Sequence, residues 1–230
     1  MDSVALIIPA AGSGERLNRT TAKPFISIAG KTILEHTITR FVPLSQVRQI
    51  VVATTTEYED VARSILKRSL PENISYVCVQ GGTERQHSIY NALRQTATVD
   101  LVAVHDAVRP FVTQQVIGQC IKAASEIGGA IVGVPAKDTI KKVDESQLVT
   151  ETPDRRWLWQ TQTPQIFKKH VLLEAYESAF KEGFIGTDDA SLVERSGYPV
   201  KMVKGDRDNF KITYPVDLKL ARLLLEEKGK

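Results

Sequence analysis

The feature that most constrains the fold of this chain is a series of short, β-branched apolar runs separated by segments with helical spacing. These runs are expected to form strands at Val4–Pro9, Gln49–Ala53, Ile74–Val79, Leu101–His105 and Ala130–Val134. Most of them are apolar throughout rather than at every second position, which indicates strands covered on both faces of a sheet. Their alternation with helices predicts an α/β fold with a doubly wound, mostly parallel sheet.

The segments between the strands place apolar residues on one face of a helix. Thr32, followed by Glu35, has the pattern of a capping box, and Thr113 is expected to be the N-cap of a later helix. The expected buried stripes are Ile33, Leu34, Ile38 and Phe41; Val61, Ile65 and Leu66; Val116, Ile117, Cys120, Ile121 and Ala124; Leu172, Leu173, Tyr176 and Phe180; and Leu218, Ala221, Leu224 and Leu225. A short helix from about Asp189 and a strand at Val200–Lys204 complete the pattern.

The alternation breaks in the polar stretch Ala136–Gln160, which carries strand-like fragments at Thr139–Val143 and Leu148–Thr150 but no helical stripe. A structureless loop of this length is uncommon inside a compact domain. We therefore expect a β-arm that protrudes from a single domain spanning residues 1–230. The apolar residues near its end, Trp157, Leu158 and Trp159, would be costly to leave in water, so the arm is expected to pair with a second copy in a two-fold homodimer.

Composition limits the classes of function. The net charge of the 230-residue chain is only +3, which argues against a nucleic-acid-binding surface. No apolar run approaches the roughly 18 residues that a membrane helix needs, so no membrane partner is expected. The core pattern begins at Val4, which leaves no room for a signal peptide. Cys78 and Cys120 lack metal-ligand spacing and are expected to be buried in a reducing compartment, the cytoplasm.

The first strand ends in a loop of small residues, Pro9-Ala10-Ala11-Gly12-Ser13-Gly14-Glu15-Arg16-Leu17. Backbone N–H groups can approach phosphate oxygens closely there, and Arg16 and Lys23 supply the positive charge that a triphosphate requires. A dinucleotide fingerprint is excluded because its third glycine is replaced by Leu17. A P-loop at Gly30-Lys31-Thr32 is excluded because Phe25 stands at its first glycine. An ordinary glycine turn with surface cations remains an alternative.

Two more strand ends carry polar motifs. In Gly81–Ile89, paired glycines let the backbone approach a flat base, and the Ser88 hydroxyl can bond the base edge, while Thr83 is expected to cap the following helix. In His105–Phe111, a carboxylate and a guanidinium at i and i+3 suit a phosphorylated polyol and a metal. A local ion pair that fixes the turn is the alternative.

These motifs resemble the signature of sugar-phosphate nucleotidyltransferases, in particular the family of 2-C-methyl-D-erythritol 4-phosphate cytidylyltransferases. The resemblance covers nearly the whole chain, because later motifs follow in the family's order: Lys137–Lys141, Asp154-Arg155, Thr163–Gln165, Thr187-Asp188 and Asp208–Thr213. Leu17 and Ile89 are conservative departures from it. It implies a Rossmann-like nucleotidyltransferase fold and transfer of the cytidylyl group of CTP to a polyol phosphate, in non-mevalonate isoprenoid precursor synthesis.

The resemblance also implies the residue roles. The catalytic residues would be Arg16, Lys23 and Lys211. The CTP-binding residues would be Ala10, Ala11, Gly12, Gly14, Gly82, Ser88, Asp106 and Ala107. The substrate-binding residues would be Asp106, Arg109, Thr139, Arg155, Thr163, Thr187 and Lys211, with Arg155 acting across the dimer. Mg²⁺ or another divalent cation would be held mainly by the triphosphate, with Asp106 a possible ligand, and His105 would brace its loop rather than transfer protons.

Other functions are compatible with parts of this pattern. A ribitol-5-phosphate cytidylyltransferase is the alternative within the same class, although Pro9-Ala10-Ala11-Gly12 favours the erythritol enzyme over a Leu-Ala-Gly-Gly opening. A non-catalytic nucleotide-binding relative is a second alternative. It is disfavoured because Arg16, Lys23 and Lys211, the cations expected to act on the reacting phosphates, are all present.

Overall fold

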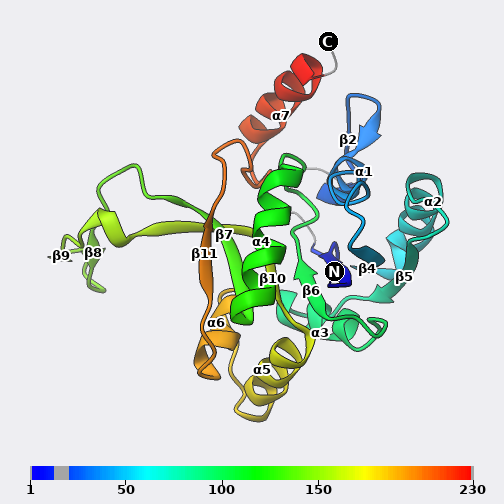
Figure 1. Cartoon of the computed structure of the whole chain (residues 1–230). Helices are drawn as coiled ribbons and strands as arrows, with labels where there is room; N and C mark the ends of the chain where they lie inside the picture. The colour runs from blue at the N-terminus through cyan, green and yellow to red at the C-terminus, as the bar shows by residue number, and fades with distance from the viewer. Residues whose placement is uncertain (1, 13–20, 229–230) are drawn as a thin grey trace.

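A seven-stranded sheet forms the centre of the molecule, with strand order β11-β7-β10-β6-β1-β4-β5 (Figure 1). The computed structural model describes residues 2–12 and 21–228. The strands of the sheet are β1 (Val4–Pro9), β4 (Val47–Thr54), β5 (Ser75–Gln80), β6 (Leu101–Val104), β7 (Gly129–Pro135), β10 (Trp159–Lys168) and β11 (Lys201–Lys204). The paired strands run parallel, except that β10 is antiparallel to both β6 and β7. The predicted α/β class and mostly parallel sheet are confirmed.

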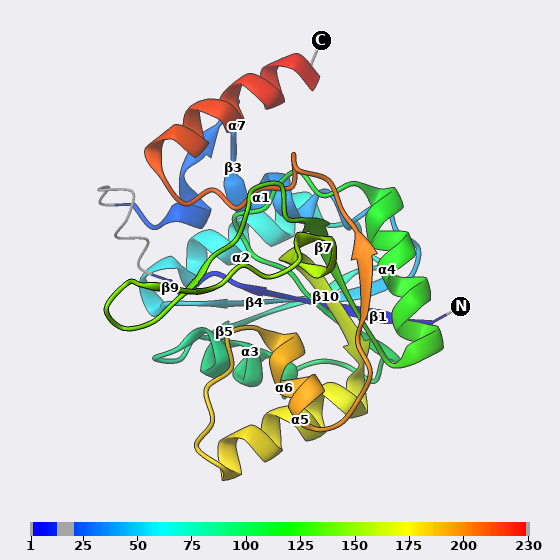
Figure 2. The same cartoon turned by 90° about the vertical axis from the view of Figure 1, so that its left-hand side faces the viewer.

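Helices cover both faces of the sheet, as the continuous apolar strands predicted (Figure 2). One layer contains α1 (Ile33–Ile38), α2 (Glu59–Ser69) and α4 (Gln114–Ile127), and the other contains α3 (Arg85–Leu93), α5 (Lys169–Lys181) and α6 (Asp189–Arg195). Successive side chains of a strand point to opposite faces. Accordingly, Leu6 and Ile8 of β1 pack in the first layer, while Ile7 packs in the second.

A third, smaller apolar cluster holds the C-terminal helix α7 (Pro215–Lys228) against the first part of the chain. Leu218 and Ala221 of α7 pack with Ile33 at the start of α1, near the hairpin of β2 (Ser27–Ile28) and β3 (Lys31–Thr32). Ile212 and Val108 belong to the same cluster, so it anchors the segment that precedes α7 beside the loop after β6. The predicted inward stripe of α7 is confirmed.

Several local predictions need correction. The Thr32 side chain caps α1 by accepting from the Glu35 N–H at 3.1 Å, but the Glu35 carboxylate pairs with Arg68 at 2.8 Å rather than completing a capping box. Val61 is 44% exposed, and Ala62 takes its place in the buried face of α2. The Thr113 cap of α4 and the burial of Cys78 and Cys120 are confirmed.

The largest omission is strand β10, which pairs with β7 from Trp159 onward, so the protruding segment ends before Trp159 rather than at Gln160. Its first half is polar and it contains Pro164, a residue that normally argues against an interior strand. The structure accommodates Pro164 because the ladder with β7 shifts register between Thr161 and Gln165. Sequence patterns alone did not reveal this interruption.

The predicted β-arm projects from the body of the molecule beyond β7 and β10 (Figure 1). It contains the two-stranded hairpin of β8 (Lys142–Val143) and β9 (Val149–Glu151), followed by the 3₁₀ turn η4 (Arg155–Trp157). Leu148 is 67% exposed and Trp157 is 80% exposed. Within the described part of the chain, no helix is long and apolar enough to cross a bilayer.

Candidate active site

A cavity of about 650 Å³ opens at the carboxyl edge of the parallel strands. It lies where β1 has β4 on one side and β6 on the other, the kind of strand-order reversal at which open α/β sheets bind ligands. Loops after β1, β5 and β6 form its walls, together with the 3₁₀ turn η2 (Lys23–Phe25) and the segment before α7. The predicted residues that line it are Ala10, Ala11, Gly12, Lys23, Gly82, Ser88, Asp106, Ala107 and Lys211. The predicted residues Gly14 and Arg16 lie outside the described residues.

The loops after β1 and β5 touch each other at Gly81. A Cβ atom placed on Gly81 would overlap the Ala11 Cβ and lie 3.2 Å from the Ser88 Oγ. The buried Ser88 hydroxyl accepts a hydrogen bond from the Gly82 N–H at 2.9 Å and donates to the Glu84 carbonyl at 3.2 Å. It thus organises the loop, and its contact with a base stays a prediction. Glu84, not Thr83, occupies the N-cap position of α3, and its side chain makes no capping hydrogen bond, so the prediction of a Thr83 cap is wrong.

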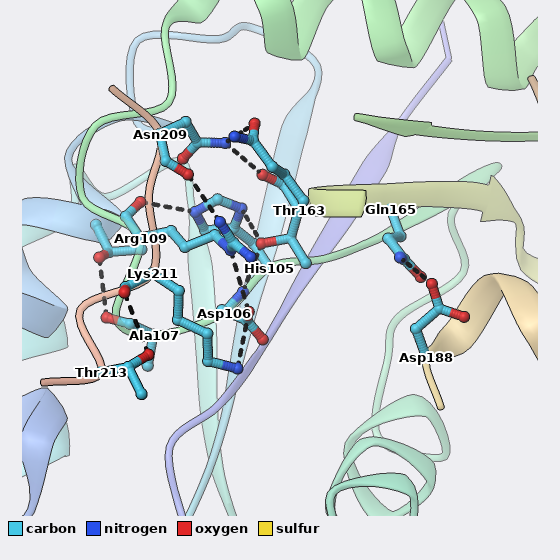
Figure 3. Close-up of polar contacts among 12 residues, drawn as sticks. His105, Asp106, Ala107, Arg109, Thr163, Gln165, Asp188, Asn209, Lys211 and Thr213 are labelled. Carbon is cyan, nitrogen blue, oxygen red and sulfur yellow. Dashed lines mark hydrogen bonds and ion pairs between the residues drawn. The ribbon is translucent and has the colours of Figure 1, made fainter. Parts of the chain in front are cut away.

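Asp106 is a buried anion of the site, and it faces cations from different parts of the chain (Figure 3). Its Oδ2 lies 3.2 Å from both Arg109 Nε and Lys211 Nζ, and its Oδ1 lies 3.6 Å from Arg85 Nε. Burial alone would raise the pKa of the Asp106 carboxyl, but Lys211, Arg85 and Arg109 together hold that pKa well below its usual range. Asp106 is therefore ionised at any physiological pH.

Behind Asp106, His105 and Thr163 fix the course of the loop (Figure 3). The Thr163 hydroxyl accepts from the Asp106 N–H at 3.0 Å and lies 3.0 Å from His105 Nδ1, while His105 Nε2 lies 3.0 Å from the Arg109 carbonyl oxygen. Burial lowers the pKa of His105 to about 4. A neutral imidazole that donates to Arg109 and accepts from Thr163 satisfies all of these contacts, in agreement with the predicted bracing role. Thr163 supports the cavity from behind rather than lining it.

The segment that carries Lys211 is attached at several points. Asn209 is buried and its side-chain amide donates to the Thr163 carbonyl at 2.9 Å, while Arg109 Nη1 donates to the Asn209 carbonyl at 2.7 Å. Lys23 Nζ lies 3.4 Å from the Thr213 carbonyl oxygen. Lys23 is itself buried, at 8% exposure, which contradicts the alternative of a glycine turn with surface cations at this position. The Lys211 side chain, by contrast, is 40% exposed.

Three predicted substrate residues lie elsewhere. Thr139 and Arg155 are exposed on the arm, where Arg155 Nη1 donates to the Lys137 carbonyl at 3.1 Å. Thr187 is exposed in the segment before α6. None of them lines the cavity of the described chain, so their contact with a substrate stays a prediction.

Comparison with known proteins decides the family. The family model described as 2-C-methyl-D-erythritol 4-phosphate cytidylyltransferase matches residues 4–227. The chain belongs to this family. The resemblance seen in the motifs is confirmed, and the chain is an enzyme of the cytidylyltransferase type, a kind of nucleotidyltransferase.

Relatives and solved structures of the family match over nearly their whole lengths. The 2-C-methyl-D-erythritol 4-phosphate cytidylyltransferase of Caldanaerobacter subterraneus subsp. tengcongensis is 43% identical over 98% of this chain and 100% of its own. The enzyme of the same name from Symbiobacterium thermophilum is 44% identical over 99% of this chain and 94% of its own. The crystal structure of the enzyme from Thermus thermophilus superposes with a TM-score of 0.79 at 33% identity, covering 97% of this chain and 99% of that one. The crystal structure of 4-diphosphocytidyl-2C-methyl-D-erythritol synthase from Anaerococcus prevotii superposes with a TM-score of 0.87 at 30% identity. That match covers 98% of this chain and 99% of the other.

Two charged residues linked to Asp106 through ion pairs, Arg85 and Asp189, are not among the site residues predicted from the sequence. Arg85 Nη2 pairs at 2.8 Å with Asp189, whose side chain is fully buried and also accepts from the Tyr176 hydroxyl at 2.5 Å. Arg85 lies within the Gly81–Ile89 motif, where the glycines and Ser88 already account for a base site and give no separate signal for the arginine. Asp189 was placed only as the start of a helix, and its partners are brought to it by tertiary packing.

The described residues suit a divalent cation that arrives with a nucleotide. They contain no group of three or more His, Cys, Asp or Glu side chains able to hold a metal. Asp106 does offer a carboxylate at the cavity, beside Lys211 and Arg85. One carboxylate with several phosphate oxygens is the donor set that Mg²⁺ usually takes at nucleotide sites. The residues therefore fit such a cation.

Proposed function

We propose that the chain transfers the cytidylyl group of CTP to 2-C-methyl-D-erythritol 4-phosphate, releasing pyrophosphate and forming the CDP-linked product used in isoprenoid precursor synthesis. The observation that carries this proposal is the family match over residues 4–227. It is supported by the cavity, which is lined by residues of the motifs predicted to bind the nucleotide and its phosphates. A cytoplasmic location belongs to the same proposal, and it rests on the reducing environment that Cys78 and Cys120 indicate.

The reaction is an in-line substitution at the α-phosphorus of CTP. A phosphate oxygen of the acceptor forms the new P–O bond, and the bond from the α-phosphorus to the bridging oxygen of the β-phosphate breaks. Pyrophosphate leaves with that electron pair. Because the attacking oxygen is already an anion, no general base is needed, which agrees with a neutral, buried His105. Catalysis then depends on positioning and charge neutralisation.

Cations of the chain perform the neutralisation. Lys23 and Lys211 approach the cavity from separate segments, and Lys23 Nζ contacts the stretch of chain that carries Lys211. Both ammonium groups are placed to face phosphate oxygens as negative charge shifts to the leaving group. A Mg²⁺ ion held by the triphosphate and Asp106 would add further charge stabilisation. Ala10 and Ala11 have only methyl side chains and Gly12 has none, which leaves the backbone N–H groups accessible to the phosphates.

The active site is further proposed to be shared between two subunits. Trp157 and Leu148 are exposed on an arm that projects from the body, and burial against a second copy would remove that apolar surface from water. The same pairing would carry Arg155 away from its own cavity and toward the partner's. There its guanidinium can hold the acceptor phosphate through two hydrogen bonds.

The substrate assignment is tested by pyrophosphate release with CTP and either the erythritol or the ribitol phosphate. We expect turnover with the methylerythritol phosphate at a kcat/KM at least about tenfold above that with ribitol 5-phosphate, because fixed polar groups discriminate between polyols. Faster turnover of the ribitol substrate would select the alternative function. If neither acceptor supports release of pyrophosphate from CTP, both functions are rejected.

Subunit sharing is tested by mixing variants. Arg155→Ala and Lys211→Ala homodimers are each expected to be nearly inactive, whereas a heterodimer has one site with both residues intact and recovers part of the activity. The neighbouring Arg156→Ala is the matched control, because Arg156 is 79% exposed and paired with Asp154 on the same arm. A monomer at assay concentration, or no recovery after proven subunit exchange, refutes the shared site.

A further inference from the structure

Arg85 occupies a junction between parts of the site that come from distant segments of the chain. It is the first residue of α3, directly after the glycine loop, and it lines the cavity with 34% of its side chain exposed. Its Nη2 pairs with Asp189 at 2.8 Å, and its Nε faces Asp106 at 3.6 Å. One guanidinium therefore bridges the loop after β5, the loop after β6 and the start of α6.

The Asp189 end of this bridge is rigid. The Asp189 side chain is fully buried, and it accepts a hydrogen bond from the buried Tyr176 hydroxyl of α5. An arginine paired with a carboxylate held in this way loses little further freedom when it acts on a second group. Burial alone would lower the pKa of Arg85, but Asp189 and Asp106 raise that pKa above its ordinary value, so Arg85 carries its charge permanently.

A second contact fixes the same two segments to each other. The Gln86 side chain donates to the Phe184 carbonyl at 3.0 Å and accepts from the Gly186 N–H at 2.9 Å. Two successive residues in the first turn of α3, Arg85 and Gln86, thereby hold the segment of residues 184–189. That segment contains Thr187, which family resemblance assigns to the acceptor substrate.

The Asp106 end of the bridge sets the direction of the carboxylate. Arg109 and Lys211 both contact Oδ2, whereas Arg85 faces Oδ1. Cations on both oxygens oppose rotation of the carboxylate in either direction. Arg85 thus connects the glycine loop after β5, Asp106 in the loop after β6, and the segment of residues 184–189 that contains Thr187.

We propose that Arg85 is a positioning residue for cytidylyl transfer, anchored by Asp189, that aligns Asp106 and the acceptor segment with the bound nucleotide. The inference rests on the proposed function and names a residue that the family motifs did not assign. It predicts that Arg85 affects the geometry of reaction more than the affinity for CTP. Misplacement of reacting groups by about 1 Å costs on the order of 10²-fold in rate.

The test compares kcat with CTP binding in folded variants. Arg85→Gln is expected to lower kcat by about 10- to 100-fold while the Kd for CTP, measured without the acceptor, stays within about threefold. Arg85→Lys keeps the charge but reaches only one carboxylate at a time, so an intermediate kcat is expected. Arg63→Gln is the matched control, because Arg63 forms an exposed pair with Glu59 at 2.7 Å on α2, away from the cavity, and kcat should not change.

A double-mutant cycle separates positioning from general destabilisation. Asp189→Asn should lower kcat in the same direction, and the double variant with Arg85→Gln should be no slower than the slower single variant, because the two residues act as a unit. Multiplicative losses in the cycle would overturn the proposal, as would a folded Arg85→Gln enzyme with kcat within about threefold of wild type. If Asp189→Asn does not fold, the comparison of Arg85→Gln with Arg85→Lys still decides. Wild-type turnover, measured alongside, tests the proposed function separately, because the inference is judged from the ratio of variant to wild type.

Discussion

Substitution of Gly81 by alanine tests whether the contact between the loops after β1 and β5 sets the geometry of the site. The added Cβ would approach the Ala11 Cβ more closely than 3.0 Å, a separation that Cβ atoms essentially never show. Neither loop yields easily, because the Gly81 N–H donates to the Thr54 carbonyl at 2.8 Å and the Ala10 N–H donates to the Ala53 carbonyl at 2.7 Å. Both loops are therefore attached to the end of β4, and the methyl group must push them apart.

The size of the effect follows from that displacement. To reach ordinary van der Waals contact, the loops must separate by about 1 Å, and misplacement of this size costs on the order of 10²-fold in rate. We expect Gly81→Ala to lower kcat/KM with CTP by about that factor. Its thermal midpoint should fall by only a few degrees, because the overlap lies at the surface of the cavity rather than in the core.

Steady-state pyrophosphate release and thermal unfolding provide the assay, with two controls. Gly118→Ala in α4 adds the same methyl group where nothing lies within 4 Å, and it should keep full activity and raise the unfolding free energy by about 0.5–1 kcal/mol. Adding Ala11→Gly to Gly81→Ala removes the overlapping atom and should restore most of the activity. A double variant as impaired as Gly81→Ala alone would refute the steric argument.

The remaining predictions concern the base, the phosphates and pH. CTP should be turned over at least about 10²-fold better than ATP or GTP, because a site that bonds a specific base edge leaves buried polar groups unpaired with the wrong base; comparable kcat/KM values would contradict the cytosine assignment. Lys211→Ala and Lys23→Ala should each lower kcat by about two orders of magnitude, with a larger loss of thermal stability for the buried Lys23; near-normal kcat at saturating substrate in a folded variant would exclude a transition-state role. His105 has a pKa of about 4 against an ordinary value of 6.5, so the unfolded chain takes up the proton first and the unfolding free energy should fall by on the order of 3 kcal/mol between about pH 6.5 and pH 4. In urea denaturation, the His105→Gln variant should not show this loss of unfolding free energy on acidification. A variant whose unfolding free energy depends on pH as the wild type's does would contradict the assignment to His105.

The sequence was sufficient to predict the parallel part of the sheet. Strand β1 and residues 50–53 of β4 are buried on both faces, so these residues are all apolar and the pattern is visible without knowledge of the neighbours. Strand β10 was missed because its polar residues and Pro164 are stabilised by partners far away in the chain. Gln165, for example, donates to the Asp188 carboxylate at 2.8 Å and accepts from the Ala190 N–H at 3.0 Å. No local pattern predicts such contacts.

The same distinction applies to the site. Its glycine loops and its cations at the ends of strands are local motifs, because close backbone approach needs small residues at fixed spacing, and the family can be identified from them. The arrangement around Asp106 required the tertiary structure. Lys211, Arg109 and Arg85 reach one carboxylate only because the segment before α7, the β6 loop and α3 pack at the same sheet edge. Asp189 became recognisable as part of the site only through burial, since a buried carboxylate must find a cation and the fold brings Arg85 to it.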